Sequence, residues 1–191
     1  MVEPRRRQAR DELCRFIMVV TACSAALAGC TMFARTEDAP RATARLVPTS
    51  GNSVIGVVSF TQLADGVRID ADISGLAPNS EHGFHVHEKG DCSAPDGTSA
   101  GPHFNPDGAP HGMPEHAGHH AGDMLNLKSD GAGFAHYTWK TSALSIGGAK
   151  GNVVGRAVII HRDPDDYASQ PAGNSGPRLA CGVIQLQAPE S

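Results

Sequence analysis

The stretch SVIGVVSFTQLADGVRIDADISGL, residues 53–76, decides the fold of this chain. Apolar residues alternate with polar or small ones along both halves of the stretch, which meet at Ala64 and Asp65. Side chains that alternate with a period of two lie on opposite faces of a β-strand. Each half therefore predicts one short strand.

The same alternation recurs on both sides of this stretch. It is found in ATARLVP, residues 42–48; HGFHVHE, residues 82–88; MLNLKSDGAGFAHYTW, residues 124–139; NVVGRAVIIH, residues 152–161; and CGVIQLQ, residues 181–187. Gly, Asn and Asp stand at the breaks, and no helical pattern of useful length occurs. The sequence predicts an all-β fold, an antiparallel sandwich or barrel of about eight short strands.

Two long loops interrupt the predicted strands, at residues 89–123 and 162–178. Loops of this length in a compact domain usually carry function. We therefore expect the functional residues in or beside them.

The first 29 residues are predicted to be a signal peptide. Five Arg residues precede the uncharged run FIMVVTACSAALAG, residues 16–29, which is too short to span a bilayer comfortably. The sequence LAGC, residues 27–30, resembles the lipobox of bacterial lipoproteins, which predicts cleavage before Cys30 and its acylation. Ordinary secretion, with cleavage at a nearby small residue, is the alternative. Thr31 after the Cys favours the outer membrane.

The processed chain contains 162 residues, enough for one domain with its own core. Residues 30–41 are polar, small and aperiodic, which predicts a flexible tether before a β-domain at residues 42–191. The signal peptide holds five Arg against three acidic residues, so its removal changes the formal net charge from −4 to about −6. An acidic exported chain without a basic run is a poor candidate for binding nucleic acid.

Two of the five Cys residues remain available for pairing. Cys14 and Cys23 leave with the signal peptide, and Cys30 takes lipid. Cys92 and Cys181 therefore predict one disulfide, because exported chains fold in an oxidising compartment. Closing a loop of roughly ninety residues stabilises a fold by at most about 4–5 kcal/mol in the chain-entropy description.

The distribution of histidine residues indicates a metal-binding site. Nine of the ten His residues lie between Glu81 and Thr138, and five of those fall in one loop rich in Gly and Pro. His85 and His87 lie two apart in a predicted strand, so both side chains leave one face and can reach one ion. A single His on such a face is more often structural, but the shaped loop adds further ligands. The potential metal ligands are His85, His87, His103, His111, His120, Asp123 and His161.

This composition favours two different metals. Three imidazoles and one carboxylate make the closed tetrahedral set that is typical of zinc. Four imidazoles suit copper better than calcium or magnesium, which prefer oxygen ligands.

Five separate segments carry a specific resemblance. They are GFHVHEKGDC, residues 83–92; SAGPHFNP, residues 99–106; HAGD, residues 120–123; the segment around His161; and GPRLACGVI, residues 176–184. Together they resemble the Cu/Zn superoxide dismutase family. The resemblance implies a Greek-key β-barrel or flattened immunoglobulin-like sandwich.

The resemblance also implies that each chain binds one copper ion and one zinc ion, and it implies which ligands bind each metal. Copper is assigned to His85, His87, His103 and His161, and zinc is assigned to His103, His111, His120 and Asp123. His103 would bridge the two metals. His120 is preferred to His119, because only His120 leaves two residues before Asp123. His116 and His119 are expected to face solvent, where one could bind a stray metal.

Two further residues take roles from the resemblance. Asp165 is expected to be an outer carboxylate that links a copper His to a zinc His and orients both rings; an ordinary loop or helix-cap Asp is the alternative. Arg178 is expected to guide the superoxide anion toward copper, because the net negative charge of the chain repels that anion. A surface ion pair is the alternative for Arg178.

The implied reaction is dismutation of superoxide to oxygen and hydrogen peroxide. Copper would alternate between Cu(II) and Cu(I), His103 would take and return a proton, and zinc would hold the loop. A periplasmic copper- and zinc-binding or buffering protein without turnover is the alternative. A zinc hydrolase is disfavoured, because the closed zinc set leaves no site for water.

The expected location is the bacterial cell envelope or periplasm, where a lipid on Cys30 anchors the protein to the outer membrane. The expected role there is protection from oxidative damage. Monomer and homodimer are both compatible with the sequence. The segment DDYASQP, residues 165–171, resembles bacterial periplasmic members, and the surrounding loop has no Lys or Glu. Electrostatic steering therefore cannot be carried over from eukaryotic members.

Overall fold

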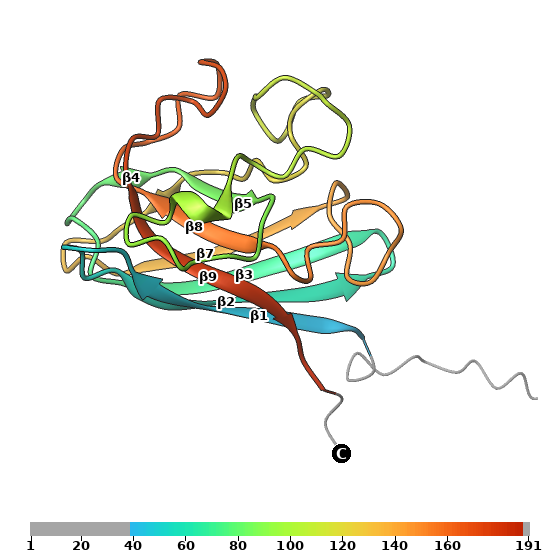
Figure 1. Cartoon of the computed structure of the whole chain (residues 1–191), viewed down its shortest axis with the longest axis horizontal. Coiled ribbons are helices and arrows are strands. Elements are labelled where there is room, and N and C mark those ends of the chain that lie inside the picture. Colours follow the sequence, from blue (N-terminus) through green and yellow to red (C-terminus); the bar gives the residue numbers. More distant parts are fainter. Residues whose placement is uncertain (1–38, 189–191) are drawn as a thin grey trace, which may run out of the picture. The chain divides into compact units, whose positions relative to one another are not determined.

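The structure is a computed structural model, and it describes residues 39–188 (Figure 1). The predicted signal peptide, Cys30 and most of the predicted tether lie outside the described residues. Strand β1 (Arg41–Pro48) begins at the last residue of the predicted tether. Within the described range, no helix is long and apolar enough to cross a membrane.

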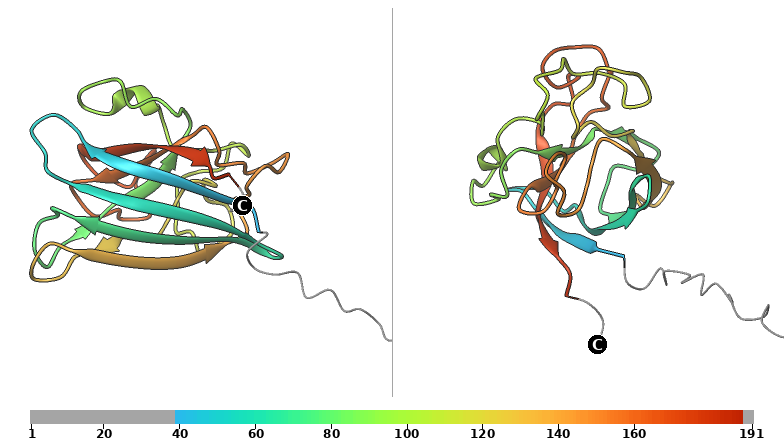
Figure 2. Two further views of the ribbon diagram at one scale, coloured as in Figure 1. Left: turned by 90° about the horizontal axis from the view of Figure 1, so that it is seen from below. Right: turned by 90° about the vertical axis from the view of Figure 1, so that its right-hand side faces the viewer.

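Residues 39–188 contain nine strands and one short 3-10 helix. After β1 they are β2 (Ile55–Leu63), β3 (Gly66–Ser74), β4 (Glu81–His82), β5 (Phe84–His87), the helix η2 (Thr98–Ala100), β6 (Leu127–Lys128), β7 (Ala135–Thr141), β8 (Ala157–His161) and β9 (Arg178–Leu186). Seven strands form one curled antiparallel sheet (Figure 2), in the order β5-β8-β9-β1-β2-β3-β7. Strand β4 pairs with β6. The all-β prediction is confirmed.

Alternation along β2 and β3 produces the core, as the opening stretch predicts. Val58 pairs with Ala71 and Phe60 pairs with Ile69, and all four side chains are buried. Burying a large apolar side chain such as that of Phe60 stabilises the fold by roughly 1.5–3 kcal/mol. The sheet therefore has one apolar face that packs inward.

Residues 124–139, which form one alternating segment in the sequence, contain strand β6 and most of strand β7. A turn separates β6 from β7, and the Asp130 side chain closes it by accepting hydrogen bonds from the backbone N–H groups of Ala132 and Phe134. Asp and Gly favour such turns. The loop at residues 89–123 is also less irregular than expected, since it contains η2 and pairs with β5 through His103 and Asp123.

The later part of the first long loop and the second long loop rise on the same side of the sheet in Figure 1 and in the right-hand view of Figure 2. The side chain of Gln170 in the second loop holds the first loop at His111: its Oε1 accepts from the His111 N–H at 2.9 Å, and its Nε2 donates to the His111 carbonyl at 2.8 Å. The disulfide between Cys92 and Cys181 ties the first loop to β9 and confirms the predicted pairing. The fold thus brings both loops over one end of β5 and β8.

Candidate metal centre

Two groups of potential metal ligands lie in the part of the chain that the structure describes. The four-histidine set consists of His85, His87, His103 and His161, and the histidine–aspartate set consists of His103, His111, His120 and Asp123. In each set the ligand atoms lie within 4.8 Å of one another, and every member is buried. The structure therefore brings together all seven predicted ligands, with His103 in both sets.

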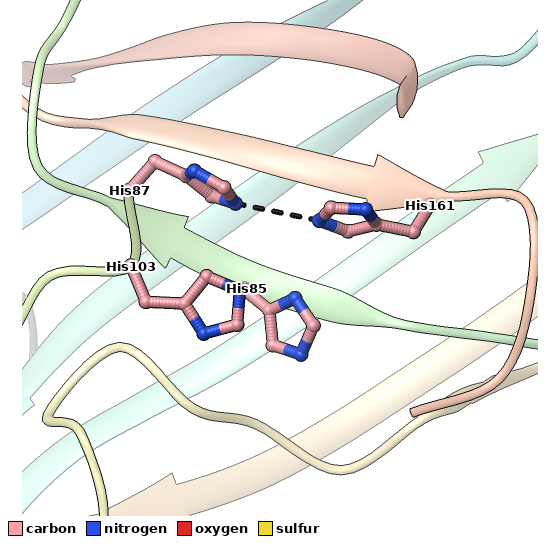
Figure 3. Close-up of side chains that lie close together, drawn as sticks. All are labelled: His85, His87, His103 and His161. Carbon is pink, nitrogen blue, oxygen red and sulfur yellow. Dashed lines mark hydrogen bonds between the residues drawn. The ribbon is translucent and has the colours of Figure 1, made fainter. Parts of the chain in front are cut away.

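Paired strands position the four-histidine set. His85 and His87 project from β5, and His161 ends β8, the strand that pairs with β5. The loop adds His103, which forms a backbone bridge with His87. Figure 3 shows the rings of His87 and His161 facing each other, with 3.4 Å between their Nε2 atoms, and His103 beside His85.

Hydrogen bonds fix which nitrogen of each ring faces into this set. His87 Nδ1 donates to the carbonyl of Gly101 at 2.8 Å, and His161 Nδ1 donates to that of Gly176 at 3.1 Å. His85 Nε2 donates to Asp165 Oδ2 at 2.8 Å. The opposite nitrogens, His85 Nδ1 and the Nε2 atoms of His87 and His161, are thereby left to face one another.

Burial keeps these imidazoles neutral. It lowers the pKa of His85 and His87 well below the ordinary value and that of His161 to about 4, because the charged form loses its hydration. Burial likewise lowers the pKa of His103. A neutral imidazole has a free lone pair, so the set is ready to bind a metal at neutral pH.

The histidine–aspartate set converges on one oxygen. Asp123 Oδ1 lies 2.8 Å from His103 Nδ1, 3.0 Å from His111 Nδ1 and 3.3 Å from His120 Nδ1. The other oxygen, Oδ2, accepts from the backbone N–H groups of Gly112 and His120 at 3.1 and 3.0 Å. One carboxylate oxygen thus orients the side chain and leaves the other facing the three imidazoles.

In the histidine–aspartate set, hydrogen bonds between carboxylates and imidazoles outweigh the effect of burial on the pKa values. Burial raises the pKa of Asp123, but its hydrogen bonds with His103 and His111 and the nearby ring of His120 outweigh that effect and hold the pKa well below the usual range. Burial lowers the pKa of His111, but its hydrogen bonds with Asp123 and Asp165 outweigh that effect and raise the pKa to about 9. A carboxylate that stays ionised is suited to binding a cation.

Asp165 joins the two sets from outside. Its Oδ2 accepts from His85 Nε2 at 2.8 Å, and its Oδ1 accepts from His111 Nε2 at 2.9 Å. The amide of Asn126 holds Asp165 on both sides, donating to its carbonyl at 3.0 Å and accepting from its N–H at 2.9 Å. The structure thus places Asp165 between one ring of each set, and its role toward bound metals stays a prediction.

Arg178 lies at the start of β9, beside the four-histidine set. Its guanidinium lines a pocket together with His87, His103 and His161. The guanidinium donates to the carbonyls of Gly97 and Gly101 at 2.6 and 2.7 Å. Burial lowers the pKa of Arg178, but an Arg side chain stays charged. Its contacts are backbone carbonyls rather than the surface ion pair considered above.

Sequence reasoning missed Gln170, Asn126 and Arg156, which contact the site or its supporting loops. Amides and lone cations of this kind carry no spacing pattern, so a single sequence gives no signal for them. His116 is exposed and His119 is partly exposed, as expected, and neither belongs to a ligand set.

Comparison with known proteins is consistent with this geometry. Residues 54–184 match the family described as copper/zinc superoxide dismutase. The chain belongs to the copper/zinc superoxide dismutase family. It is 42% identical over 149 residues to "Superoxide dismutase [Cu-Zn] 2" of Aquifex aeolicus, an alignment that covers 76% of this chain and 86% of that protein.

Two more relatives extend the comparison. "Superoxide dismutase [Cu-Zn]" of Paramecium bursaria Chlorella virus 1 is 45% identical over 138 residues, which cover 69% of this chain and 72% of that protein. The crystal structure of a double mutant of a SOD-like protein from Bacillus subtilis superposes with a TM-score of 0.69 at 39% identity, covering 75% of this chain and 96% of that one. The protein is therefore a copper/zinc superoxide dismutase by family, an oxidoreductase that acts on superoxide.

The residues of this chain fit the copper and zinc that the family binds. His85 Nδ1, His103 Nε2 and His120 Nδ1 are buried without a hydrogen-bond partner. An unpaired buried polar atom costs roughly 1–3 kcal/mol, and a bound metal removes this cost by accepting the lone pair. Two of the three atoms face the four-histidine set, and the third faces Asp123.

Proposed function

We propose that this protein dismutes superoxide in the bacterial cell envelope, with copper in the four-histidine set and zinc in the histidine–aspartate set. The observation that carries the assignment is the position of His103. Its Nδ1 lies 2.8 Å from Asp123 Oδ1, and its Nε2 is buried without a partner on the side of the other imidazoles. One ring therefore presents one nitrogen to each set.

The division of chemistry follows from the ligand types. Bound copper supplies one-electron redox chemistry, and bound zinc supplies a fixed positive charge without redox chemistry. His103 Nε2 is the atom that can hold a proton for the peroxide product, because Nδ1 is engaged in the histidine–aspartate set. Asp123 and His111 keep the His103 ring in place while Nε2 gains and loses that proton.

Arg178 gives the pocket a positive charge for the anionic substrate. Its two carbonyl contacts hold the guanidinium at the pocket that reaches His87, His103 and His161. A charge that is fixed in a partly buried cleft attracts an anion more strongly than an exposed charge does. Arg178 therefore offsets, near the metal, the repulsion from a chain of net negative charge.

The cell-envelope location rests on sequence and on redox chemistry. The first 29 residues resemble a lipoprotein signal, and the disulfide between Cys92 and Cys181 is stable in an oxidising compartment. Acylated Cys30 would anchor the protein to a membrane through the following segment. In this location the enzyme would remove superoxide before it damages envelope components.

The decisive experiment combines metal content with activity on one purified sample. We expect about one copper and one zinc per chain by elemental analysis, as two overlapping sets of four ligands require. The loaded protein should dismute superoxide much faster than the same concentration of free copper. A rate no higher than that of free copper would instead indicate a copper- and zinc-binding protein without turnover.

A further inference from the structure

A second arginine, Arg156, packs on Phe104, the residue that directly follows His103 of the four-histidine set. Its guanidinium carbon lies 3.4 Å from the centre of the Phe104 ring, a cation–π arrangement. Its Nη1 donates to the carbonyl of Glu88 at 2.9 Å and lies 3.1 Å from Glu88 Oε1. Its Nε donates to the carbonyl of Asn152 at 2.7 Å. The guanidinium is thus held on three sides.

These contacts reach every segment that supplies an imidazole to the set. Phe104 directly follows His103, and Glu88 directly follows His87 at the end of β5. Arg156 itself directly precedes β8, which ends at His161. One side chain therefore joins the loop that carries His103 to the two strands that carry the other three imidazoles.

Backbone hydrogen bonds and the hydrophobic core both hold Phe104, and the guanidinium of Arg156 adds a contact with its ring. The Phe104 N–H donates to the carbonyl of Val86 at 2.8 Å, and its carbonyl accepts from the N–H of Gly122 at 2.9 Å. These bonds align the loop with β5, and the aromatic ring packs in the hydrophobic core. The ring is buried, and Arg156, whose side chain is 23% exposed, packs over it.

We propose that Arg156 is a positioning residue that holds His103 in place against the other three imidazoles of the four-histidine set. The inference rests on the proposed assignment of copper to that set. Its effect is confined to one metal, because the histidine–aspartate set has its own supports. Asp123 Oδ2 is fixed by backbone N–H groups, and Gln170 holds His111, without any contact to Arg156.

Loss of the guanidinium therefore moves His103 relative to copper rather than to zinc. The bond between His103 Nδ1 and Asp123 Oδ1 keeps the ring with the histidine–aspartate set when Phe104 is released. The distance from His103 Nε2 to His85, His87 and His161 then varies. Support residues of this kind typically change metal affinity by roughly tenfold to a hundredfold.

The test is Arg156→Met in the protein loaded with both metals. We expect the copper dissociation constant, measured by competition with a chelator, to rise roughly tenfold or more, with zinc affinity unchanged. The electron paramagnetic resonance spectrum of bound Cu(II) should also change, because it reports the geometry of the ligand nitrogens. A purely structural role would lower the melting temperature and leave the spectrum and the ratio of the two affinities as they are, and that result would overturn the proposal.

Two companion variants separate the contacts of Arg156. Phe104→Leu keeps an apolar side chain and removes the aromatic ring, and it should reproduce the selective loss of copper affinity. The double variant should lose little more than either single one, because both break the same contact. Additive losses would contradict the proposed path through Phe104. Arg156→Lys keeps a cation at the ring without the planar fork, and it should restore part of the copper affinity.

A matched control and an independent check complete the design. Arg68→Met removes another arginine, which pairs with Asp70 on an exposed part of β3, and it should leave both affinities and the spectrum unchanged. If Arg156→Met fails to fold, Arg156→Lys and Phe104→Leu still decide the matter by the same measurements. Wild-type protein that binds no copper would contradict the metal assignment itself, which keeps that failure distinct from a failure at Arg156.

Discussion

Arg178 and His87 donate to the same oxygen atom, the backbone carbonyl of Gly101. Arg178 Nη2 lies 2.7 Å from this oxygen, and His87 Nδ1 lies 2.8 Å from it. The carbonyl therefore sets both the orientation of a proposed copper ligand and the place of the charge beside it. The carbonyl of Gly101 therefore couples the position of the Arg178 charge to the orientation of the His87 ring, although these two residues lie 91 positions apart in the sequence.

Arg178→Ala should lower the rate of superoxide dismutation by roughly tenfold or more, because it removes the charge that attracts the anion. The decline of activity with added salt should become flatter for the same reason. Copper content should stay at the wild-type level, since His87 keeps its bond to Gly101. Arg178→Lys, which keeps the charge without the fork, should lie between the two. Loss of copper from Arg178→Ala would show that the residue is structural.

Asp165→Asn should weaken metal binding without unfolding the domain. The amide has one acceptor oxygen, so either His85 or His111 loses its acceptor and meets an N–H group instead. Affinity for at least one metal should fall by about tenfold, as measured by chelator competition. Asp163→Asn serves as the control, because Asp163 pairs with exposed Arg162 at the surface. Equal behaviour of the two variants would mean that the link through Asp165 is unimportant.

Gly173→Ala should disrupt the contact between Asp165 and His111 by a steric clash, without changing any charge. Gly173 has a φ of +60°, and a Cβ there would overlap Asp165 Oδ1 and lie 2.8 Å from His111 Nε2. We expect loss of zinc affinity together with lower stability. Gly147 is the matched control, since it has a φ of +77° with nothing within 4 Å of the added Cβ. Gly147→Ala should cost only about 1–2 kcal/mol of backbone strain and keep zinc. Zinc retention in both variants would contradict the steric explanation.

Replacing Cys92 and Cys181 by Ser should lower the free energy of unfolding by up to about 4 kcal/mol. The disulfide spans 89 residues, so its removal frees a large part of the unfolded chain. Denaturant unfolding of the metal-free protein measures this effect, and reduction of the wild type should reproduce it. Activity should fall as well, because the loop that carries Gly97 and Gly101 loses its link to the strand that carries Arg178. Unchanged stability after full reduction would refute the prediction.

Cys30→Ala should release the protein from membranes, because it removes the residue that is predicted to carry lipid. Fractionation of cells into soluble and membrane portions measures the change. Cys92→Ser is a suitable comparison, since it removes a cysteine of the disulfide and should leave the protein with the membranes. Persistence of the Cys30→Ala protein in the membrane fraction would argue against lipidation.

Alternation of side chains was sufficient to predict the β-fold. The two halves of residues 53–76 form β2 and β3, with Phe60 and Ile69 buried as a cross-strand pair. Alternation alone did not locate the turn within residues 124–139, which is marked instead by the turn-forming residues Asp130 and Gly131. Alternation also could not predict the strand order, because the pairing of β9 with β1 depends on contacts between segments that are distant in the sequence.

The seven potential ligands could be selected from residue type and family resemblance, and the structure places them in two sets. Their supports could not be selected in this way. Arg156 and Phe104 lie 52 positions apart, and Gln170 lies 59 positions from His111. Such pairs meet only after folding, and neither member has an unusual local sequence. Spacing identifies residues that share a strand or a loop, whereas supports come from other elements.

His103 belongs to both ligand sets, and this has a consequence for the evolution of the site. A single substitution at His103 damages both sets at once, whereas a substitution at His85, His87 or His161 leaves all four members of the histidine–aspartate set in place. A descendant that gives up redox chemistry can therefore retain a zinc-stabilised fold by changing the latter three positions. In proteins descended from this fold that have lost the reaction, substitutions at His85, His87 and His161 should therefore appear before substitutions in the histidine–aspartate set.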